Sequence, residues 1–228
     1  MIQGSLLDGS VESSIANALH SPMNQVPNLD ELEKIVSNCT RCQLASGRTK
    51  TVFGDGNPAS GIVLIGEGPG QNEDETGLPF VGKAGQLLTK ILASVGIDRK
   101  SDIYICNTVK CRPPQNRAPE PEEMAACRPY LDGQIAAIQP KLILLAGASA
   151  VKAVLQSKVG ITKIRGQWLP SPYGDAIAMP IFHPSYLLRY ASKEPGTPKW
   201  LMWQDMKAIK AKMDELGLTV SGTPHSSL

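Results

Sequence analysis

The sequence lacks several features that mark large classes of protein. No apolar run is long enough to cross a membrane, and the N-terminus lacks the charged segment followed by an apolar segment of a secretory signal. We therefore expect a cytoplasmic protein with no membrane partner. The net charge is only +2, so binding to nucleic acid would require a local basic face.

A second absence concerns nucleotide hydrolysis. Residues 77–83, GLPFVGK, fit the spacing of a phosphate-binding loop, but Ala84 stands where such a loop has the serine or threonine that holds Mg²⁺. Pro79 also removes a backbone N–H that a phosphate cradle would use. The resemblance to such a loop is therefore superficial.

The composition is sufficient for one folded domain. The chain has 228 residues, of which 42% are hydrophobic, enough to bury a single sizeable core. Residues 1–27 are rich in Ser, Gly, Asn and Gln with weak periodicity, which predicts a poorly ordered extension. We expect a folded domain over residues 28–217 and a frayed tail over 218–228.

Short apolar runs alternate with helical patterns along the domain. The runs predicted to be strands are 61–65, 102–107, 141–146 and 177–182. Apolar residues at helical spacing predict helices over 83–92, 119–138, 149–155 and 200–216. This alternation predicts an α/β fold, a three-layer α/β/α domain with a mainly parallel central sheet of four strands.

Several local predictions accompany this architecture. Asn28 or Asp30 is expected to cap an early helix that carries Cys39 and Cys42 on one face. Pro180 favours an edge position for the last strand, and residues 164–169 are expected to form a hairpin arm. The methionine-rich stripe of the last helix is interpreted as core.

The segment Gly66–Gly82, GEGPGQNEDETGLPFVG, is the most distinctive stretch of the chain. It directly follows the first predicted strand, and ligands of open α/β sheets bind at the carboxyl ends of strands. Its acidic side chains and its glycines allow polar recognition and close backbone approach. The alternative is an acidic surface loop.

Side chains suited to binding a flat base follow three of the predicted strands. An aromatic face, a carboxamide and an imidazole are what a pocket for a hydrogen-bonding base requires. Taken singly, the aromatic residue could be core and the carboxamide a strand-end cap. The candidate residues are Glu67, Gly68, Glu73, Phe80, Asn107 and His183.

Five cysteines in a chain expected to be cytoplasmic argue against a disulfide framework. Zinc and a [4Fe–4S] cluster both accept four thiolates, and the spacing does not separate them; unrelated buried thiols are the third alternative. Cys106 is assigned to the core of a strand. The candidate metal ligands are Cys39, Cys42, Cys111 and Cys127. The arginines beside them, which suit a negatively charged site, are Arg41, Arg112 and Arg128.

Three long motifs, GEGPGQNEDETGLPFVGKAGQLL, NTVKCRPPQNRAP and FHPSYLLR, together with the four cysteines, closely resemble family 4 uracil-DNA glycosylases. This family is the iron–sulfur branch of the uracil-DNA glycosylase superfamily, and the resemblance runs from about residue 39 to residue 210. It implies a monomeric base-excision-repair enzyme that flips deoxyuridine out of single- or double-stranded DNA. The enzyme would cut the N-glycosidic bond, releasing uracil and leaving an abasic site. It also implies a [4Fe–4S] cluster on the four candidate ligands.

The resemblance also implies roles for the base pocket. Phe80 would stack on uracil, Asn107 would pair with its N3–H and O4, and Glu73 would exclude the methyl group of thymine. His183 and the backbone N–H of Gly68 would stabilise the charge that develops on O2. The best-studied branch of the superfamily has a water-activating aspartate where Gly68 stands, so either Glu67 would position the water or the flanking phosphates would stabilise the cationic sugar unaided.

For DNA, the resemblance implies a wedge and a basic rim. Leu187 would enter the minor groove as the nucleotide leaves, with a core role as the alternative and Leu188 as the competing residue. The expected phosphate-facing residues are Lys110, Arg112, Arg117 and Arg189. Two other functions stay open: a non-catalytic iron–sulfur module that binds nucleic acid, and a relative that prefers another deaminated base.

Overall fold

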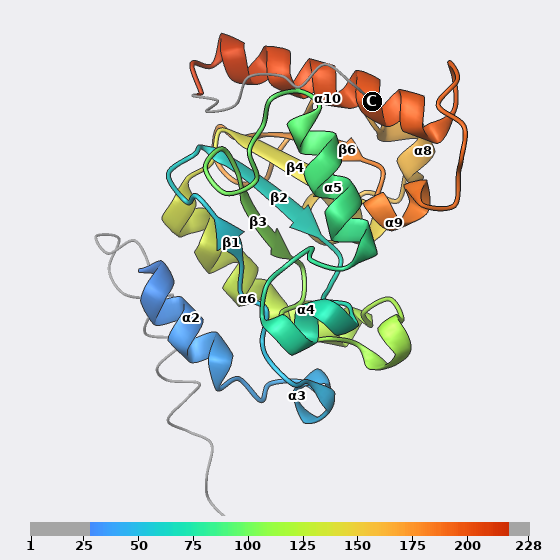
Figure 1. The fold of residues 1–228 in the computed structure, drawn as a ribbon. Coiled ribbons are helices and arrows are strands. Elements are labelled where there is room, and N and C mark those ends of the chain that lie inside the picture. The colour runs from blue at the N-terminus through green and yellow to red at the C-terminus, as the bar shows by residue number, and fades with distance from the viewer. Residues whose placement is uncertain (1–27, 219–228) are drawn as a thin grey trace, which may run out of the picture.

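A computed structural model describes residues 28–218. Its centre is a six-stranded sheet with the order β1-β3-β2-β4-β6-β5, in which β3, β2, β4 and β6 are parallel (Figure 1). The two outer strands have two residues each and pair antiparallel with their neighbours. The strands are β1 (Asp55–Gly56), β2 (Ile62–Gly66), β3 (Tyr104–Asn107), β4 (Leu142–Ala146), β5 (Leu169–Pro170) and β6 (Ile177–Ile181). The predicted four-stranded parallel sheet is confirmed, with two short edge strands added.

Helices cover both faces of the sheet, which confirms the three-layer architecture. Buried side chains of α5, α9 and α10 pack on one face, and those of α6 and α7 pack on the other. Figure 1 shows α5 and α10 on one side of the strands and α6 on the opposite side. The helices are α2 (Leu29–Ser37), α3 (Leu44–Gly47), α4 (Gln71–Thr76), α5 (Lys83–Ala93), α6 (Pro121–Ile138), α7 (Ala148–Leu155), α8 (Ile161–Ile164), α9 (Pro184–Leu187) and α10 (Pro198–Glu215), with a 3₁₀ turn η1 (Pro114–Asn116).

The parallel strands are apolar throughout because both of their faces are covered. Along β2, Ile62 and Leu64 belong to the core under α5 and α10, whereas Val63 and Ile65 belong to the core under α6 and α7. All of these side chains are 0% exposed. Successive strand residues point to opposite faces, so a strand buried on both sides reads as a continuous apolar run.

The stripe on the last helix is core, as predicted. Met202, Met206, Ile209 and Met213 of α10 are at most 1% exposed and pack onto the sheet. Across residues 28–218, no helix combines the length and the apolar character that a membrane crossing requires.

Local predictions had mixed outcomes. Asn28 caps α2, its side chain accepting a hydrogen bond from the Asp30 N–H at 2.9 Å. However, α2 ends at Ser37, so the placement of Cys39 and Cys42 on that helix is wrong. Nothing in the sequence pattern stopped the helix earlier than the cysteines, and Asn38 ends it by turning out of helical geometry.

The predicted hairpin arm over residues 164–169 is also wrong. That segment contains the end of α8, a turn and only the first residue of β5. Because β5 pairs with Ile177 and Ala178 alone, Pro180 of β6 lies beyond it. The predicted edge position is wrong for the strand, because β6 lies between β4 and β5, but no partner on the β5 side needs the missing N–H of Pro180. The predicted extension over residues 1–27 lies outside the described residues, and so does the predicted tail except for its first residue.

Candidate active site and cysteine pocket

The parallel strands end together at one edge of the sheet, and polar residues follow their ends. Gly66 of β2 lies in register with Asn107, the last residue of β3, and Ala146 of β4 lies in register with Ile181 of β6. This edge is where open α/β sheets bind their ligands. The contacts described below bring the sequence-predicted residues Glu67, Glu73, Phe80, Asn107 and His183 to it.

Asn107 provides a buried carboxamide at this edge. Its side chain is 1% exposed, and its Oδ1 has no hydrogen-bond partner among the described residues. Leaving a buried acceptor unpaired costs about 1–3 kcal/mol, so this atom is a candidate position for binding a donor. A Cβ atom on Gly66 would lie 2.4 Å from Asn107 Oδ1 and 2.5 Å from Phe80 Cζ. Only glycine therefore leaves the carboxamide and the ring side by side.

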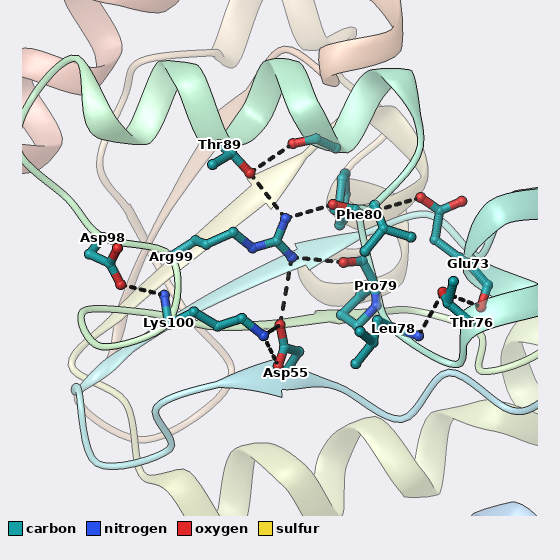
Figure 2. Close-up of polar contacts among 12 residues, drawn as sticks. Asp55, Glu73, Thr76, Leu78, Pro79, Phe80, Thr89, Asp98, Arg99 and Lys100 are labelled. Atoms are coloured by element: carbon teal, nitrogen blue, oxygen red, sulfur yellow. Dashed lines mark hydrogen bonds and ion pairs between the residues drawn. The ribbon is translucent and has the colours of Figure 1, made fainter.

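Phe80 lies on a loop that is held in an unusual conformation. Its φ angle is +52°, in the left-handed region that a non-glycine residue adopts at a cost of about 1–3 kcal/mol. Glu73 Oε1 accepts from the N–H groups of Val81 and Gly82, both at 2.8 Å, and its Oε2 accepts from the Gly70 N–H at 3.1 Å. Figure 2 shows Phe80 between Glu73 and Arg99. Glu73 Oε1 thus fixes the backbone that carries the ring and Oε2 fixes the start of α4, roles the sequence did not suggest.

His183 faces Phe80, with 5.6 Å between the ring centroids. Its Nδ1 accepts a hydrogen bond from the Ser185 N–H at 3.2 Å and lies 2.7 Å from the Ser185 hydroxyl. Because an N–H group can only donate, Nδ1 is the acceptor and the neutral ring carries its proton on Nε2. Burial lowers the pKa of His183, although the carboxylates of Glu67 and Glu73 oppose that shift. His183 is therefore a neutral donor through Nε2–H.

Glu67 is fixed by partners from two other strand ends. Its carboxylate accepts from the Ser149 hydroxyl at the start of α7. Its backbone carbonyl accepts from the Thr108 hydroxyl and, at 3.4 Å, from the Val109 N–H. Sequence reasoning missed Ser149, because a serine in the first turn of a helix looks like an ordinary capping residue.

Gly68 packs tightly against the loop that follows β3. A Cβ atom on Gly68 would lie 2.9 Å from Val109 Cγ2 and 3.7 Å from Pro113 Cδ. A side chain at this position would have to displace Val109, a residue that is 0% exposed. This contact explains physically why an aspartate does not fit where Gly68 stands.

The four predicted metal ligands line one pocket. Cys39 and Cys42 come from the segment between α2 and α3, Cys111 from the loop after β3, and Cys127 from α6. Burial raises the pKa of the Cys127 thiol to about 12 and raises the pKa of Cys42 and Cys111 as well. Cys106, in contrast, is a 0% exposed core residue of β3, as predicted. Among residues 28–218, no group of three or more His, Cys, Asp or Glu side chains is arranged to hold a metal ion.

Cationic groups surround this pocket, but they are not all those expected. Arg41 lines it, whereas Arg128 donates to Asp132 and to the Ala153 carbonyl instead. Arg48 Nη1 lies 3.3 Å from Cys111 Sγ. A cationic, largely apolar pocket with four sulfur atoms suits a cluster that carries net negative charge together with its thiolates.

Lys110 was expected on the phosphate-facing rim, and that expectation is wrong. The side chain is 1% exposed, lines the cysteine pocket, and donates from Nζ to the Asn107 carbonyl at 2.7 Å. The backbone N–H of Lys110 donates to the Sγ of Cys127 in α6 at 3.3 Å. Lys110 therefore joins the cysteine pocket to the strand end that carries Asn107.

The remaining basic residues of the predicted rim differ in how far their charges are already paired within the protein. Arg117 forms a double hydrogen bond with buried Glu123, with N–O distances of 2.6 and 2.9 Å, and holds the pKa of that carboxyl at about 2. Its charge is thereby paired, so its contribution to DNA binding is expected to be small. Arg112 donates from Nε to the Asn116 side chain at 2.7 Å, and Arg189 is exposed.

Leu187 was predicted to be the wedge, and the structure contradicts this. Leu187 is 0% exposed and belongs to the core with α5 and α10, so it cannot enter DNA without leaving that core. Leu188, the competing residue, is 49% exposed directly after α9. Adjacent residues of a helix point in different directions, so only one of Leu187 and Leu188 can face the core. The sequence did not show which of the two faces outward.

The chain is similar to known proteins of one superfamily. The model of the Uracil DNA glycosylase superfamily matches residues 53–207. The type-4 uracil-DNA glycosylase of Thermotoga maritima is 51% identical over 173 residues, which cover 72% of this chain and 88% of that protein. The type-4 enzymes of Sulfurisphaera tokodaii and Saccharolobus solfataricus are 44% and 42% identical, covering 84% and 88% of this chain and 87% and 93% of theirs. The chain therefore belongs to the uracil DNA glycosylase superfamily and, within it, to the type-4 uracil-DNA glycosylases.

Proposed function

We propose that this protein excises uracil from DNA in base excision repair. It would flip deoxyuridine out of the stack, hydrolyse the N-glycosidic bond, release uracil and leave an abasic site. The observation that carries the proposal is the buried Asn107 Oδ1, which has no partner among the described residues and lies beside the Phe80 ring. A base inside a duplex is unreachable, so an enclosed carboxamide next to an aromatic face fits a flipped base.

The carboxamide of Asn107 would select uracil over cytosine. Its Oδ1 would accept from uracil N3–H, and its Nδ2 would donate to O4. Cytosine presents an acceptor and a donor in the reverse order, which would leave both buried groups unpaired, a mismatch that such sites reject strongly. The Phe80 ring would stack on the base, a contact that contributes about 1–3 kcal/mol.

Glu73 remains our candidate for excluding thymine, in a modified form. Its carboxylate accepts from three backbone N–H groups, those of Val81 and Gly82 after Phe80 and that of Gly70 at the N-cap of α4, and these bonds fix its position. A fixed side chain beside the pocket can exclude a methyl group by bulk. Thymine release by Glu73→Ala, compared with the wild type, tests this role.

Bond cleavage would leave negative charge on uracil O2 and positive character on the sugar. The His183 Nε2–H and the Gly68 backbone N–H are the donors proposed for O2. A neutral imidazole is sufficient for this, because it donates a hydrogen bond and transfers no proton. Glu67, held by Ser149, is proposed to position the water or to stabilise the cationic sugar.

We propose that Cys39, Cys42, Cys111 and Cys127 hold a [4Fe–4S] cluster. The four cysteines line one pocket. Zinc and a [4Fe–4S] cluster both accept four thiolates, and the choice of iron rests on the resemblance to the family 4 enzymes. When bound, the cluster would cross-link the segment before α3, the loop after β3 and α6. Lys110 lines this pocket and donates to the Asn107 carbonyl, so a pocket fixed by the cluster would also fix the backbone of Asn107.

The metal assignment predicts a brown protein that contains iron and not zinc. Cys42→Ser should lose both the visible absorbance and the iron, because it removes one of four ligands. Cys106→Ser is the matched control and should keep them, since Cys106 lies in the sheet core. Metal analysis of protein purified without air measures this. A colourless wild type loaded with zinc would contradict the cluster.

We propose Leu188, in place of Leu187, as the wedge that holds the opened base step. Leu188→Ala should lower the excision rate on duplex DNA strongly and on single strands little, because a single strand has no stack to hold open. Leu187→Ala is the matched control: it should lose stability by about 2–5 kcal/mol through a core cavity, without distinguishing the two substrates. Single-turnover rates and thermal unfolding measure both effects. Equal losses by Leu188→Ala on both DNA forms would remove it as the wedge.

The test of the function itself is excision from a labelled oligonucleotide. A uracil-containing strand should break at the uracil position after incubation with the protein and then alkali, because alkali cleaves at abasic sites. The same strand with thymine at that position should stay intact. We also propose, as further parts of this reading, that the protein acts as a monomer in the cytoplasm on single- or double-stranded DNA.

A further inference from the structure

The Phe80 loop is held from two sides, and only one side belongs to the predicted site. On one side, Glu73 takes the N–H groups of Val81 and Gly82. On the other, Arg99 Nη1 donates to the Phe80 carbonyl at 2.7 Å and Nη2 donates to the Pro79 carbonyl at 2.8 Å. Figure 2 shows this arrangement with the Arg99 guanidinium directed at both carbonyls.

Arg99 is itself held in place, although it comes from the connection between α5 and β3. Its Nη1 also donates to the Thr89 hydroxyl at 3.1 Å, and its Nη2 lies 3.7 Å from the Asp55 carboxylate. Its side chain is 13% exposed, and the Asp55 side chain is 16% exposed. A guanidinium that is removed from water needs such partners for its charge and its N–H groups.

The conformation of Phe80 explains why such a clamp is required. With φ at +52°, the residue relaxes out of the left-handed region unless its surroundings fix it. The first turn of α5 presses on the same backbone: a Cβ atom on Gly85 would lie 2.0 Å from both the carbonyl carbon and the carbonyl oxygen of Phe80. The Glu73 carboxylate on one side and the Arg99 guanidinium on the other then fix the peptide groups before and after Phe80. The ring therefore stays beside Asn107 Oδ1.

We propose that Arg99, oriented by Asp55, is a positioning residue that presents the Phe80 ring to the base. The expected effect on the rate of uracil release rests on the proposed function. The expected effect on the position of the Phe80 ring does not. Arginine suits the role because its planar guanidinium reaches two carbonyls at once, whereas a lysine ammonium is a point charge on a flexible stem.

The kinetic test is a double-mutant cycle between Arg99→Met and Phe80→Ala on single-stranded uracil DNA. Phe80→Ala removes the stacking contact and should lower the single-turnover rate by about 5- to 150-fold. Arg99→Met should lower the rate by no more than this, because it acts only through the Phe80 ring. In the Phe80→Ala background, Arg99→Met should change the rate less than about 2-fold, because the ring it positions is gone. Equal losses in both backgrounds would overturn the proposal.

Two further variants keep the test interpretable. Lys100→Met is the matched control, because Lys100 also pairs with Asp55, at 2.7 Å, but is 61% exposed, and its side-chain hydrogen bonds go to Asp55 and not to the Phe80 or Pro79 carbonyls. It should leave the rate unchanged. Arg99→Lys, which keeps the charge, covers the case in which Arg99→Met does not fold. It should show a smaller loss than Phe80→Ala that again disappears in the Phe80→Ala background.

A second measurement is independent of activity. The chain has three phenylalanines, so fluorine-labelled phenylalanine gives a simple ¹⁹F spectrum in which Phe80→Ala assigns the Phe80 signal. Arg99→Met should shift or broaden that signal and leave those of Phe53 and Phe182 in place. An unchanged Phe80 signal would refute the positioning role even if uracil excision is confirmed. A shifted signal in a protein that releases no uracil would refute the proposed function and leave the clamp standing.

Discussion

Replacing His183 by alanine is expected to lower the single-turnover rate of uracil release by about 10²–10³-fold, the loss typical of removing one oxyanion donor. The charge on uracil O2 appears only as the bond breaks, so the lost hydrogen bond affects the transition state far more than the bound state. Affinity for uracil-containing DNA should therefore change much less than the rate. The comparison of rate and binding on one DNA substrate measures this.

The controls for His183 use its neighbours and its pKa. Ser185→Ala keeps the imidazole and its backbone partner and should cost far less than His183→Ala. Because burial lowers the pKa of His183 below the ordinary value of 6.5, the wild-type rate should show no step at pH 6.5. A change is expected only at lower pH, where protonation of Nδ1 would remove its bond from the Ser185 N–H. Parallel losses of binding and rate in His183→Ala would contradict the charge-stabilising role.

Asn107→Asp is expected to abolish the discrimination against cytosine. The position is 1% exposed, and burial favours the neutral carboxylic acid. A neutral carboxyl group can place its donor and its acceptor in either order, so it can pair with cytosine as well as with uracil, whereas an ionised one has no donor for uracil O4. Cytosine release should therefore become detectable, and any ionised fraction should excise uracil about 5- to 150-fold more slowly, from about 1–3 kcal/mol for the unpaired O4.

Asn107→Ala is the control that distinguishes a changed base preference from a general loss of activity. It removes the carboxamide without offering a new pattern, so uracil excision should fall while cytosine release stays absent. Rates on matched strands with uracil or cytosine at one position measure both variants. If Asn107→Asp lowers the uracil rate but never releases cytosine, the carboxamide does not set the choice between these bases.

The sequence predicted what depends on local pattern. Strand ends are visible as apolar runs that stop, so the places of Asn107 and His183 at one sheet edge followed from the alternation of strands and helices. The stripe on α10 and the core position of Cys106 followed from periodicity in the same way. Glu67 and Phe80 were found because they lie in a motif directly after a strand.

The sequence did not predict what depends on packing between distant segments. Lys110 looked like a phosphate contact, because nothing local shows that a lysine is buried and bonded to the Asn107 carbonyl. Arg99 lies 19 residues from Phe80, in a different connection, and no pattern joins them. Leu187 and Leu188 are equivalent in the sequence, and only the packing of α9 under α5 separates the buried one from the exposed one.

The most direct test of the account is the identity of the base that the wild-type protein releases. An equimolar mixture of duplexes that carry uracil, cytosine or thymine at one position is incubated with the iron-loaded protein, and the free bases are identified by mass spectrometry. The account predicts free uracil, in an amount equal to the abasic sites in its strand, with no free cytosine or thymine. Release of another base in preference to uracil, or no release by the folded iron-containing protein, would contradict it.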